Sequence, residues 1–485
     1  MRPSVRYSVV LLLLVGCGDG MGRFDASDTR IDTANIYFDP DSAGARICTD
    51  GVGGIYAAWT DDRDGPDSVW FNRSHDGGTT WMTDAVLISG GWDAREPDIA
   101  CSGSDVHIVW TDTRDGELQH PNGYVASSLD GGTTFSEPML LERDTSGRFL
   151  TLQPRISAGG SFVHITWMNN RYGAYDVFAL SSADRGTSFT QPENLTGSAR
   201  GAAWSGNPTI ASDTLGNAVV AWEDTGAGGS DIHTAFTADA GQSWTGAQRI
   251  DTGVEPGLSD AHNIAMDFDG TELTVVWHDS RKGTGWGVFA NQWSGGQWLP
   301  EAINIDQGVP GNDAMSPTVT VVGSTAHVVW HDDRYGSMKV LYRSLTGGVL
   351  GMAPVQLNGG HSLAHGLYPQ IQSSDGALVV VWEDTRMDGS GTNNDLFYDL
   401  SDDGGMTWRE VDLRINSNRG GSTFALDPSI VVEAGELLTA WVDGRNETAD
   451  IYFNRLALGE AAHTPEGTPA EPTDEVSSET EGEWQ

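Results

Sequence analysis

Tryptophan, aspartate and arginine recur together along the chain. The repeat reads apolar-apolar-Trp-x-Asp-x-Arg, as in AAWTDDR (57–63) and VVWHDDR (328–334), and it occurs eight times. A carboxylate and a guanidinium so close together can form charge-assisted hydrogen bonds with each other. They could instead form a ring of charges that holds an anionic or sugar ligand. Because a catalytic site needs one acid in one place rather than eight copies, we favour a structural Asp–Arg pair.

Six copies of the repeat contain all three residues, and two copies depart from it. The complete copies are Trp59, Asp61, Arg63, Trp110, Asp112, Arg114, Trp277, Asp279, Arg281, Trp330, Asp332, Arg334, Trp382, Asp384, Arg386, Trp441, Asp443 and Arg445. The third copy has Asn169 in place of aspartate, and the fourth has Gly226 in place of arginine. His278 and His331 occupy the variable position after the tryptophan, and we interpret them as residues at a strand edge.

Short β-strands are the elements that must position these residues. The tryptophans are 51 to 59 residues apart, and the intervening runs are β-branched, rich in aromatics and bounded by Gly, Asp, Asn and Pro. A period near 50 residues with only strand signals indicates a β-propeller, in which four-stranded antiparallel blades repeat around an axis. The second period, for example, predicts strands over 96–103, 105–112, 123–128 and 138–142. The sequence therefore predicts an all-β propeller of eight four-stranded blades over residues 29–458.

The two ends of the repeat region predict how the ring closes. After DIYFNRLALG (450–459) no fourth strand follows, but TRIDTA (29–34) closely matches QRIDTG (248–253), the predicted fourth strand of the fourth blade. We therefore expect the N-terminal strand to complete the eighth blade, which would pair the last open sheet edge.

A second repeat, S/T-x-D-x-G-x-T/S-W/F, occurs in five blades, beginning with SHDGGTTW (74–81). It resembles the Asp-box, or BNR, repeat of sialidases and their propeller relatives. The resemblance covers roughly residues 29 to 458, and it implies that the box lies on the turn between the third and fourth strands, opposite the catalytic mouth. The residue types of the box suit a turn whose side chains form hydrogen bonds with its own backbone. We therefore interpret the motif as a structural element that stabilises the fold. Its aspartates are Asp76, Asp130, Asp184, Asp239 and Asp403.

The same resemblance raises the question of an enzyme. Sialidases use three arginines on the substrate carboxylate, a Tyr–Glu nucleophile pair and an Asp acid/base, and they carry an Arg-Ile-Pro signature that this chain lacks. Sialidase propellers also have six blades, against eight predicted here. If the chain were sialidase-like, the candidate catalytic residues on its loops would be Arg95, Arg148, Arg200, Arg419, Tyr368 and Glu255. Nothing in their spacing demands such a site, and we favour the interpretation that they are scattered surface residues.

Charge and composition exclude one class of partner. The 485-residue chain has a formal net charge of −41, with 68 Asp and Glu against 27 Lys and Arg. Nucleic-acid binding is excluded on this basis, because no cationic field is available to displace counterions. We expect no cofactor; the acidic stretch DDRDGPD (61–67) leaves calcium open, although its spacing departs from the EF-hand pattern.

The first 28 residues predict lipid attachment to a bacterial cell envelope. Two arginines precede a short apolar run that ends in LVGC, as in a lipoprotein signal peptide. We predict a signal peptide over 1–16, lipidation of Cys17, and a tether over 17–28 that anchors the protein to the membrane by lipid alone. Gly18 favours the outer membrane under the sorting rule of enteric bacteria. The Pro-, Glu- and Thr-rich tail, 459–485, is predicted to be disordered.

The other two cysteines, Cys48 and Cys101, fall on the innermost strands of the first and second blades. Cys48 lies one residue after Ile47 and Cys101 two residues after Ile99, so they point to opposite sheet faces and in adjacent blades they can face each other. We expect a disulfide between them in an oxidising compartment.

Two functions stand at this point. One is a non-catalytic, surface-anchored monomer that binds glycan or protein partners at the propeller mouth. The other is a sialidase-like glycoside hydrolase that acts on extracellular glycans. No Ser–His–Asp signature, zinc motif or phosphate loop argues for a different chemistry.

Overall fold

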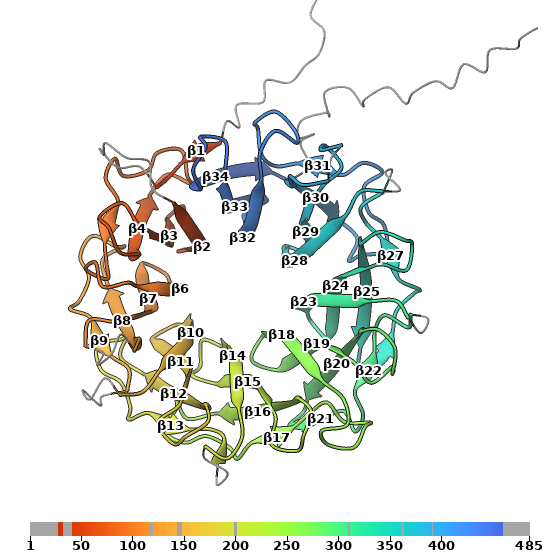
Figure 1. The fold of residues 1–485 in the computed structure, drawn as a ribbon, viewed down its shortest axis with the longest axis horizontal. Helices are drawn as coiled ribbons and strands as arrows, with labels where there is room; N and C mark the ends of the chain where they lie inside the picture. Colours follow the sequence, from red (N-terminus) through yellow and green to blue (C-terminus); the bar gives the residue numbers. More distant parts are fainter. Residues whose placement is uncertain are drawn as a thin grey trace, which may run out of the picture.

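The computed structural model describes residues 28–32, 41–115, 120–142, 148–197, 201–308, 311–359, 363–389 and 391–458. These residues form 34 strands in eight separate antiparallel sheets. Figure 1 shows the sheets arranged as blades around a central axis, in chain order. The predicted all-β, eight-bladed propeller is confirmed. Within the described part of the chain, no helix is both long and apolar enough to cross a membrane.

Each blade is built outward from an inner strand. The inner strands are β2 (Ser42–Thr49), β6 (Arg95–Ser102), β10 (Thr151–Gly159), β14 (Ser205–Ser212), β18 (Ala261–Phe268), β23 (Ala314–Val322), β28 (Gly366–Ser374) and β32 (Ala425–Glu433). The second strands are β3 (Ile55–Asp61), β7 (Asp105–Asp112), β11 (Phe162–Asn169), β15 (Ala218–Asp224), β19 (Glu272–Asp279), β24 (Thr325–Asp332), β29 (Ala377–Asp384) and β33 (Glu436–Asp443).

The third and outer strands complete the blades. The third strands are β4 (Ser68–Ser74), β8 (Asn122–Ser128), β12 (Asp176–Ser182), β16 (Asp231–Thr237), β20 (Gly287–Ser294), β25 (Lys339–Thr346), β30 (Asp395–Ser401) and β34 (Asp450–Ala457). The outer strands are β5 (Val86–Leu87), β9 (Met139–Leu140), β13 (Glu193–Asn194), β17 (Gln248–Arg249), β31 (Leu413–Arg414) and β1 (Thr29–Arg30). In blades 5 and 6 the outer strand is split into β21 (Gln297–Trp298) with β22 (Ile303–Asn304), and β26 (Val349–Leu350) with β27 (Val355–Gln356).

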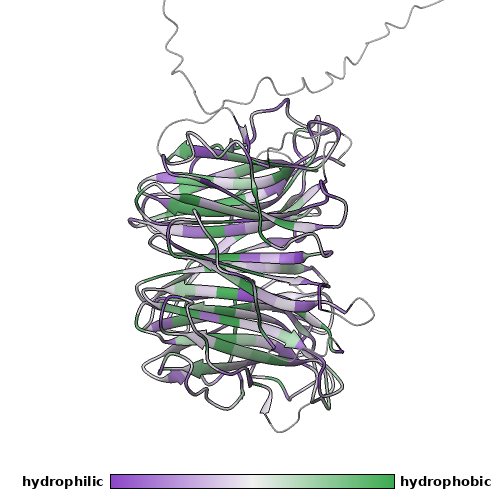
Figure 2. Cartoon of the chain, turned by 90° about the vertical axis from the view of Figure 1, so that its left-hand side faces the viewer, coloured by the Kyte–Doolittle hydropathy of each residue, from purple (hydrophilic) through white to green (hydrophobic). Residues whose placement is uncertain are grey.

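The hydrophobic core lies between adjacent blades. The second strands are buried along almost their whole length, and all eight repeat tryptophans have no exposed surface. Figure 2 shows the apolar residues along the stacked strands and hydrophilic residues in many of the connections. Because large rings dominate burial in such layers, the repeated tryptophan is a packing residue.

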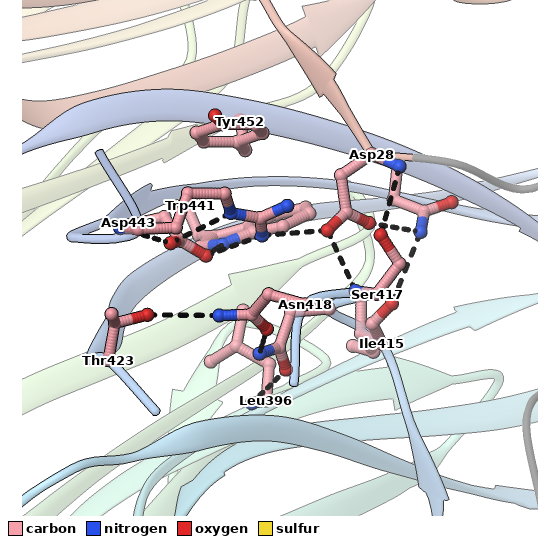
Figure 3. Close-up of polar contacts among 12 residues, drawn as sticks. Asp28, Leu396, Ile415, Ser417, Asn418, Thr423, Trp441, Asp443 and Tyr452 are labelled. Atoms are coloured by element: carbon pink, nitrogen blue, oxygen red, sulfur yellow. Dashed lines mark hydrogen bonds and ion pairs between the residues drawn. The ribbon is translucent and has the colours of Figure 1, made fainter. Parts of the chain in front are cut away.

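The N-terminal strand closes the ring, as predicted. Strand β1 pairs antiparallel with β34, with Thr29 opposite Phe453. Ile31 then has no exposed surface and donates its N–H to the Ile451 carbonyl at 2.9 Å. Just before this strand, the Asp28 carboxylate accepts hydrogen bonds from the Ser417 N–H and the Asn454 amide (Figure 3). The first residues of the propeller are thereby fixed between its seventh and eighth blades.

Side chains also link the inner strands, whose inner edges have no strand partner. The Asp98 carboxylate accepts the N–H of Ile156 in the next blade at 3.1 Å. Gln372 likewise bonds both the Ile430 carbonyl and the Val432 N–H of the eighth blade. Such contacts satisfy an edge that would otherwise be left open.

A disulfide takes the place of such a contact between blades 1 and 2. Cys48 and Cys101 are bonded, with their Cα atoms 5.7 Å apart, a separation within the ordinary range for disulfides.

Candidate functional site

The two ends of the propeller carry different motifs. Each inner strand starts level with the end of the second strand, as Ser42 opposite Asp61 shows, and ends level with the start of that strand. The third strand also ends level with the start of the second strand, with Ser74 opposite Ile55. The Asp-box turns therefore lie at one end of the axis, here called the box end. The Asp–Arg motifs and the connections between blades lie at the other, here called the bulge end.

The Asp-box turns form one closed hydrogen-bond network, repeated five times. In blade 7, Asp403 Oδ1 accepts the Ser401 hydroxyl and the Thr407 N–H, and Oδ2 accepts the Thr407 hydroxyl. These bonds lower the pKa of Asp403 to about 2. The networks of Asp76, Asp130, Asp184 and Asp239 use the same atoms.

The glycine and the aromatic residue of each box contact the preceding blade. Phe135 packs edge-on against Phe71 with ring centroids 5.0 Å apart, and Trp408 meets Tyr342 at 4.9 Å. Gly132 has a φ of +72°, and a Cβ there would overlap the Phe71 ring. The turn thus holds two blades together, and the carboxylate of its aspartate is bonded within the turn itself.

The Asp–Arg motifs are buried clamps rather than a free ring of charge. In the second blade, Asp112 has no exposed surface and accepts both the indole N–H of Trp110 and the guanidinium of Arg114. That guanidinium lies 4.4 Å from the Tyr124 ring centre and donates to the Ser89 carbonyl of the first blade. These contacts favour the structural interpretation of the motif.

The same clamp recurs in the other complete copies. The indole N–H bonds the aspartate in each of them: Trp59 with Asp61, Trp277 with Asp279, Trp330 with Asp332, Trp382 with Asp384 and Trp441 with Asp443. The aspartate pairs with the arginine in each: Arg63, Arg281, Arg334, Arg386 and Arg445. Figure 3 shows the last of these pairs, in which Arg445 also reaches Asp28 at 2.7 Å.

A feature that the sequence analysis missed distinguishes the bulge end. Every inner strand has a register shift near its start, and the residue at the shift has a left-handed backbone with φ between 48° and 65°. The eight residues are Gly44, Glu96, Gln153, Asn207, Asn263, Ser316, Tyr368 and Asp427. Left-handed geometry costs a non-glycine residue about 1 kcal/mol. Seven of the eight positions carry this cost, and their seven side chains are of six different types.

The variable residue of the Asp–Arg motif supports these bulges. In four consecutive blades its side chain accepts the backbone N–H of the next bulge. Glu223 accepts from Asn263 at 3.1 Å, and Glu383 accepts from Asp427 at 2.9 Å. Between them, Nδ1 of His278 faces the Ser316 N–H at 3.5 Å and Nδ1 of His331 faces the Tyr368 N–H at 3.2 Å. The position read as a mere strand edge is therefore a bulge support.

The polar groups of these blades have shifted pKa values with clear physical causes. A 2.7 Å hydrogen bond with Glu223 raises the pKa of His262, whose side chain is 38% exposed. Burial lowers the pKa of His278 and of His331 to about 4, so both rings are neutral at pH 7. Burial raises the pKa of Glu383.

Exposed aromatic rings gather at the same end. Among the described residues, four Trp or Tyr side chains are about half exposed: Trp92, Tyr172, Tyr335 and Tyr368. Trp92 lies between β5 and β6, Tyr172 and Tyr335 follow second strands, and Tyr368 is itself a bulge residue. All four belong to the bulge end.

The described candidate residues of a sialidase-like site lie on different strands and connections. Arg95 pairs with Asp67 at 2.9 Å and Asp93 at 3.0 Å. Arg148, Arg419 and Glu255 are exposed on three different connections, and Tyr368 packs on His331. Among these described residues, no hydrogen bond or ion pair joins any two. Arg200, like Cys17, lies outside the described residues.

Three of the four carboxylates in the acidic stretch at 61–67 contact protein groups. Asp61 binds Trp59 and Arg63, Asp62 accepts the Asp41 N–H, and Asp67 pairs with Arg95. Among the described residues there is no group of three or more His, Cys, Asp or Glu side chains arranged to hold a metal ion.

Comparison with known proteins finds structural likenesses at low sequence identity. No protein-family model and no curated protein matches the chain. An ulvan lyase structure is 11% identical, covering 90% of this chain and 96% of its own, with a TM-score of 0.47. The sialidase of Trypanosoma rangeli in complex with sialic acid is 12% identical, covering 77% of this chain and 55% of its own, with a TM-score of 0.37. The Penicillium chrysogenum α-L-arabinanase with arabinobiose is 15% identical, covering 76% of this chain and 94% of its own, with a TM-score of 0.39. Likeness at this level carries no information about the ligand of this chain.

Proposed function

We propose that this protein is a lipid-anchored, non-catalytic propeller that binds a carbohydrate at its bulge end. The observation that carries the proposal is the ring of eight bulges, where one left-handed backbone geometry presents a glycine and seven side chains of six different types. Strained backbone that persists at the same place in every blade is typical of ligand sites. The invariant motifs stabilise the ring, which leaves the variable positions free to recognise a ligand.

The chemistry of the bulge end suits a sugar. Its bulge residues include amide, hydroxyl and carboxylate groups, which can bond hydroxyls. The exposed rings of Trp92 and Tyr368 offer flat apolar faces, and aromatic faces combined with a few placed polar groups are the usual lining of small-molecule sites.

The attachment to a membrane is part of the proposal. Cys17 would carry the lipid, residues 17–28 would be the tether, and the cell envelope, with the outer membrane favoured, would be the location. Metabolic labelling with an alkynyl fatty acid should mark the wild-type chain and leave Cys17→Ser unlabelled. Labelling of both would contradict the anchor without affecting the sugar site.

The function is tested by binding to an array of cell-surface and plant glycans. Tyr368→Ala should weaken binding to the best glycan at least about tenfold, as truncation of an interface aromatic does. Met406→Ala, which removes an exposed side chain at the box end of the same blade, is the matched control and should bind normally. Release of sugar from a fluorogenic glycoside panel would contradict the non-catalytic proposal. Absence of glycan binding by the wild-type chain would refute the function itself.

A further inference from the structure

The geometry points to His278 and His331 as paired hydrogen-bond donors that select a neutral, hydroxyl-rich glycan over blades 5 to 7. The inference rests on the proposed function and deepens it, because it names the ligand class and the part of the ring that binds it.

The two histidines are held in one tautomer. Each uses Nδ1 to face the backbone N–H of the bulge in the next blade, Ser316 for His278 and Tyr368 for His331. A ring nitrogen that accepts a hydrogen bond carries no proton, so in a neutral ring the proton must lie on Nε2. Both rings are neutral at pH 7, because burial lowers their pKa to about 4. Each therefore presents one Nε2–H.

These Nε2–H groups have no protein partner among the described residues, although the rings are buried. His278 is 8% exposed and His331 is 3% exposed. Buried donors are nearly always satisfied by protein, water or ligand. The two bulge-end donors are available to a ligand.

An aromatic ring accompanies each donor. Trp286 packs edge-on against His278 with ring centroids 4.7 Å apart, and Tyr368 packs in the same way against His331 at 5.5 Å. The two histidines occupy equivalent positions in adjacent blades, so the pair forms two similar units side by side. Each unit combines one N–H donor with one aromatic ring, which matches a sugar unit that offers one oxygen and one apolar face.

The charges around these units disfavour an anionic sugar. The neighbouring carboxylates are Glu223 and Glu383, which support the bulges on either side. The described arginines of the inner strands, Arg46, Arg95 and Arg155, belong to blades 1, 2 and 3, across the ring from blades 5, 6 and 7 (Figure 1). A carboxylated sugar would meet neutral donors and would be repelled by the negative charges of the glutamates. Hydroxyl and ether oxygens can accept hydrogen bonds from the neutral N–H groups without this repulsion.

The test uses titration calorimetry on the purified full-length chain in detergent. The probes are cellohexaose, xylohexaose and arabinohexaose as neutral glycans, with hexagalacturonate and 3′-sialyllactose as acidic ones. We expect a neutral probe to bind at least tenfold more tightly than either acidic probe. His278→Asn and His331→Asn keep an oxygen acceptor near the position of Nδ1 and lose the outward donor. Each should weaken the neutral probe about tenfold, the effect of one hydrogen bond of about 1.4 kcal/mol, with an unchanged melting temperature.

The matched control is His107→Asn, which alters a buried neutral histidine at the box end and should leave affinity unchanged. Should an Asn variant unfold, ¹⁵N-histidine NMR of the wild-type chain replaces it, and addition of the neutral probe should shift two Nε2–H resonances. Wild-type affinity in both Asn variants, the absence of a shift, or preference for an acidic probe would overturn this inference while the proposed function stands. Failure of the wild-type chain to bind any glycan, here and on the array, would overturn both.

Discussion

Adjacent glycines in the blade 7 Asp-box offer a direct test of the idea that the box joins two blades. Gly404 and Gly405 both have left-handed backbones, with φ of +72° and +85°. A Cβ at Gly404 would have nothing within 4 Å, whereas a Cβ at Gly405 would overlap the hydroxyl and ring of Tyr342 in blade 6. Alanine at the first site thus tests backbone strain alone, and alanine at the second adds the contact between blades.

The two substitutions should differ measurably. Gly404→Ala should lower the free energy of unfolding by about 1 kcal/mol, the strain of an alanine at positive φ. Gly405→Ala adds the displacement of a buried ring that also packs on Trp408, and overpacking of this kind costs about 1–3 kcal/mol. The expected total for Gly405→Ala is therefore about 2–4 kcal/mol.

Urea unfolding followed by tryptophan fluorescence measures both values under the same conditions, with the midpoint and slope reported for each variant. Equal destabilisation by the two alanines would refute the inter-blade role of the box glycine, and would leave only its role in the turn. A loss confined to the slope would instead indicate that the ring no longer unfolds as one unit.

Three further predictions concern the ring and its pH dependence. Replacing Cys48 and Cys101 with serine should lower the free energy of unfolding by about 3–4 kcal/mol, because the bond closes a loop with a sequence separation of 53 residues; an unchanged urea midpoint would contradict this. Ile31→Ala should cost about 2–4 kcal/mol in the same assay, since this side chain is fully buried where the N-terminal strand closes the ring; a near-neutral effect would show that closure contributes little to stability. The third prediction follows from the pKa of Asp403, lowered to about 2 from 3.8, which stabilises the fold above pH 3.8 and loses that effect as the pH falls towards 2. As the pH falls from 3.8 towards 2, the melting temperature of Asp403→Asn should therefore approach that of the wild type, and Asp402→Asn serves as the control. A constant difference between the two melting temperatures would contradict the assignment of this effect to Asp403.

Most of the fold could be predicted from the sequence because the residues that define it recur from blade to blade. The tryptophan spacing fixed the blade number, and a six-residue match between 29–34 and 248–253 located the closing strand. The disulfide followed from placing Cys48 and Cys101 on neighbouring inner strands. Repetition could not show the split outer strands of blades 5 and 6, since these depend on short local pairings that differ from blade to blade.

The bulge ring escaped prediction for a physical reason. Glycine or asparagine usually indicates a left-handed backbone conformation in a sequence. Here that conformation occurs at residues as different as Glu96, Ser316 and Tyr368. A weaker signal was present, because proline follows the bulge residue in six blades, as in EPDI (96–99) and YPQI (368–371). Proline lacks the N–H that a bulged position leaves without a ladder partner, so its recurrence marked the register shift.

Repetition and function are therefore separated along each strand of this propeller. A position that must clamp blades keeps its residue type in nearly every copy, as Asp112 and its equivalents do. A position that contacts a ligand off the symmetry axis of the ring cannot be the same in eight blades, because one ligand presents different groups to each of them. The backbone at such a position can still be constant, and the bulges combine constant backbone with variable side chains. In a symmetric ring, positions where strained geometry repeats and residue type does not are the ones to search for recognition.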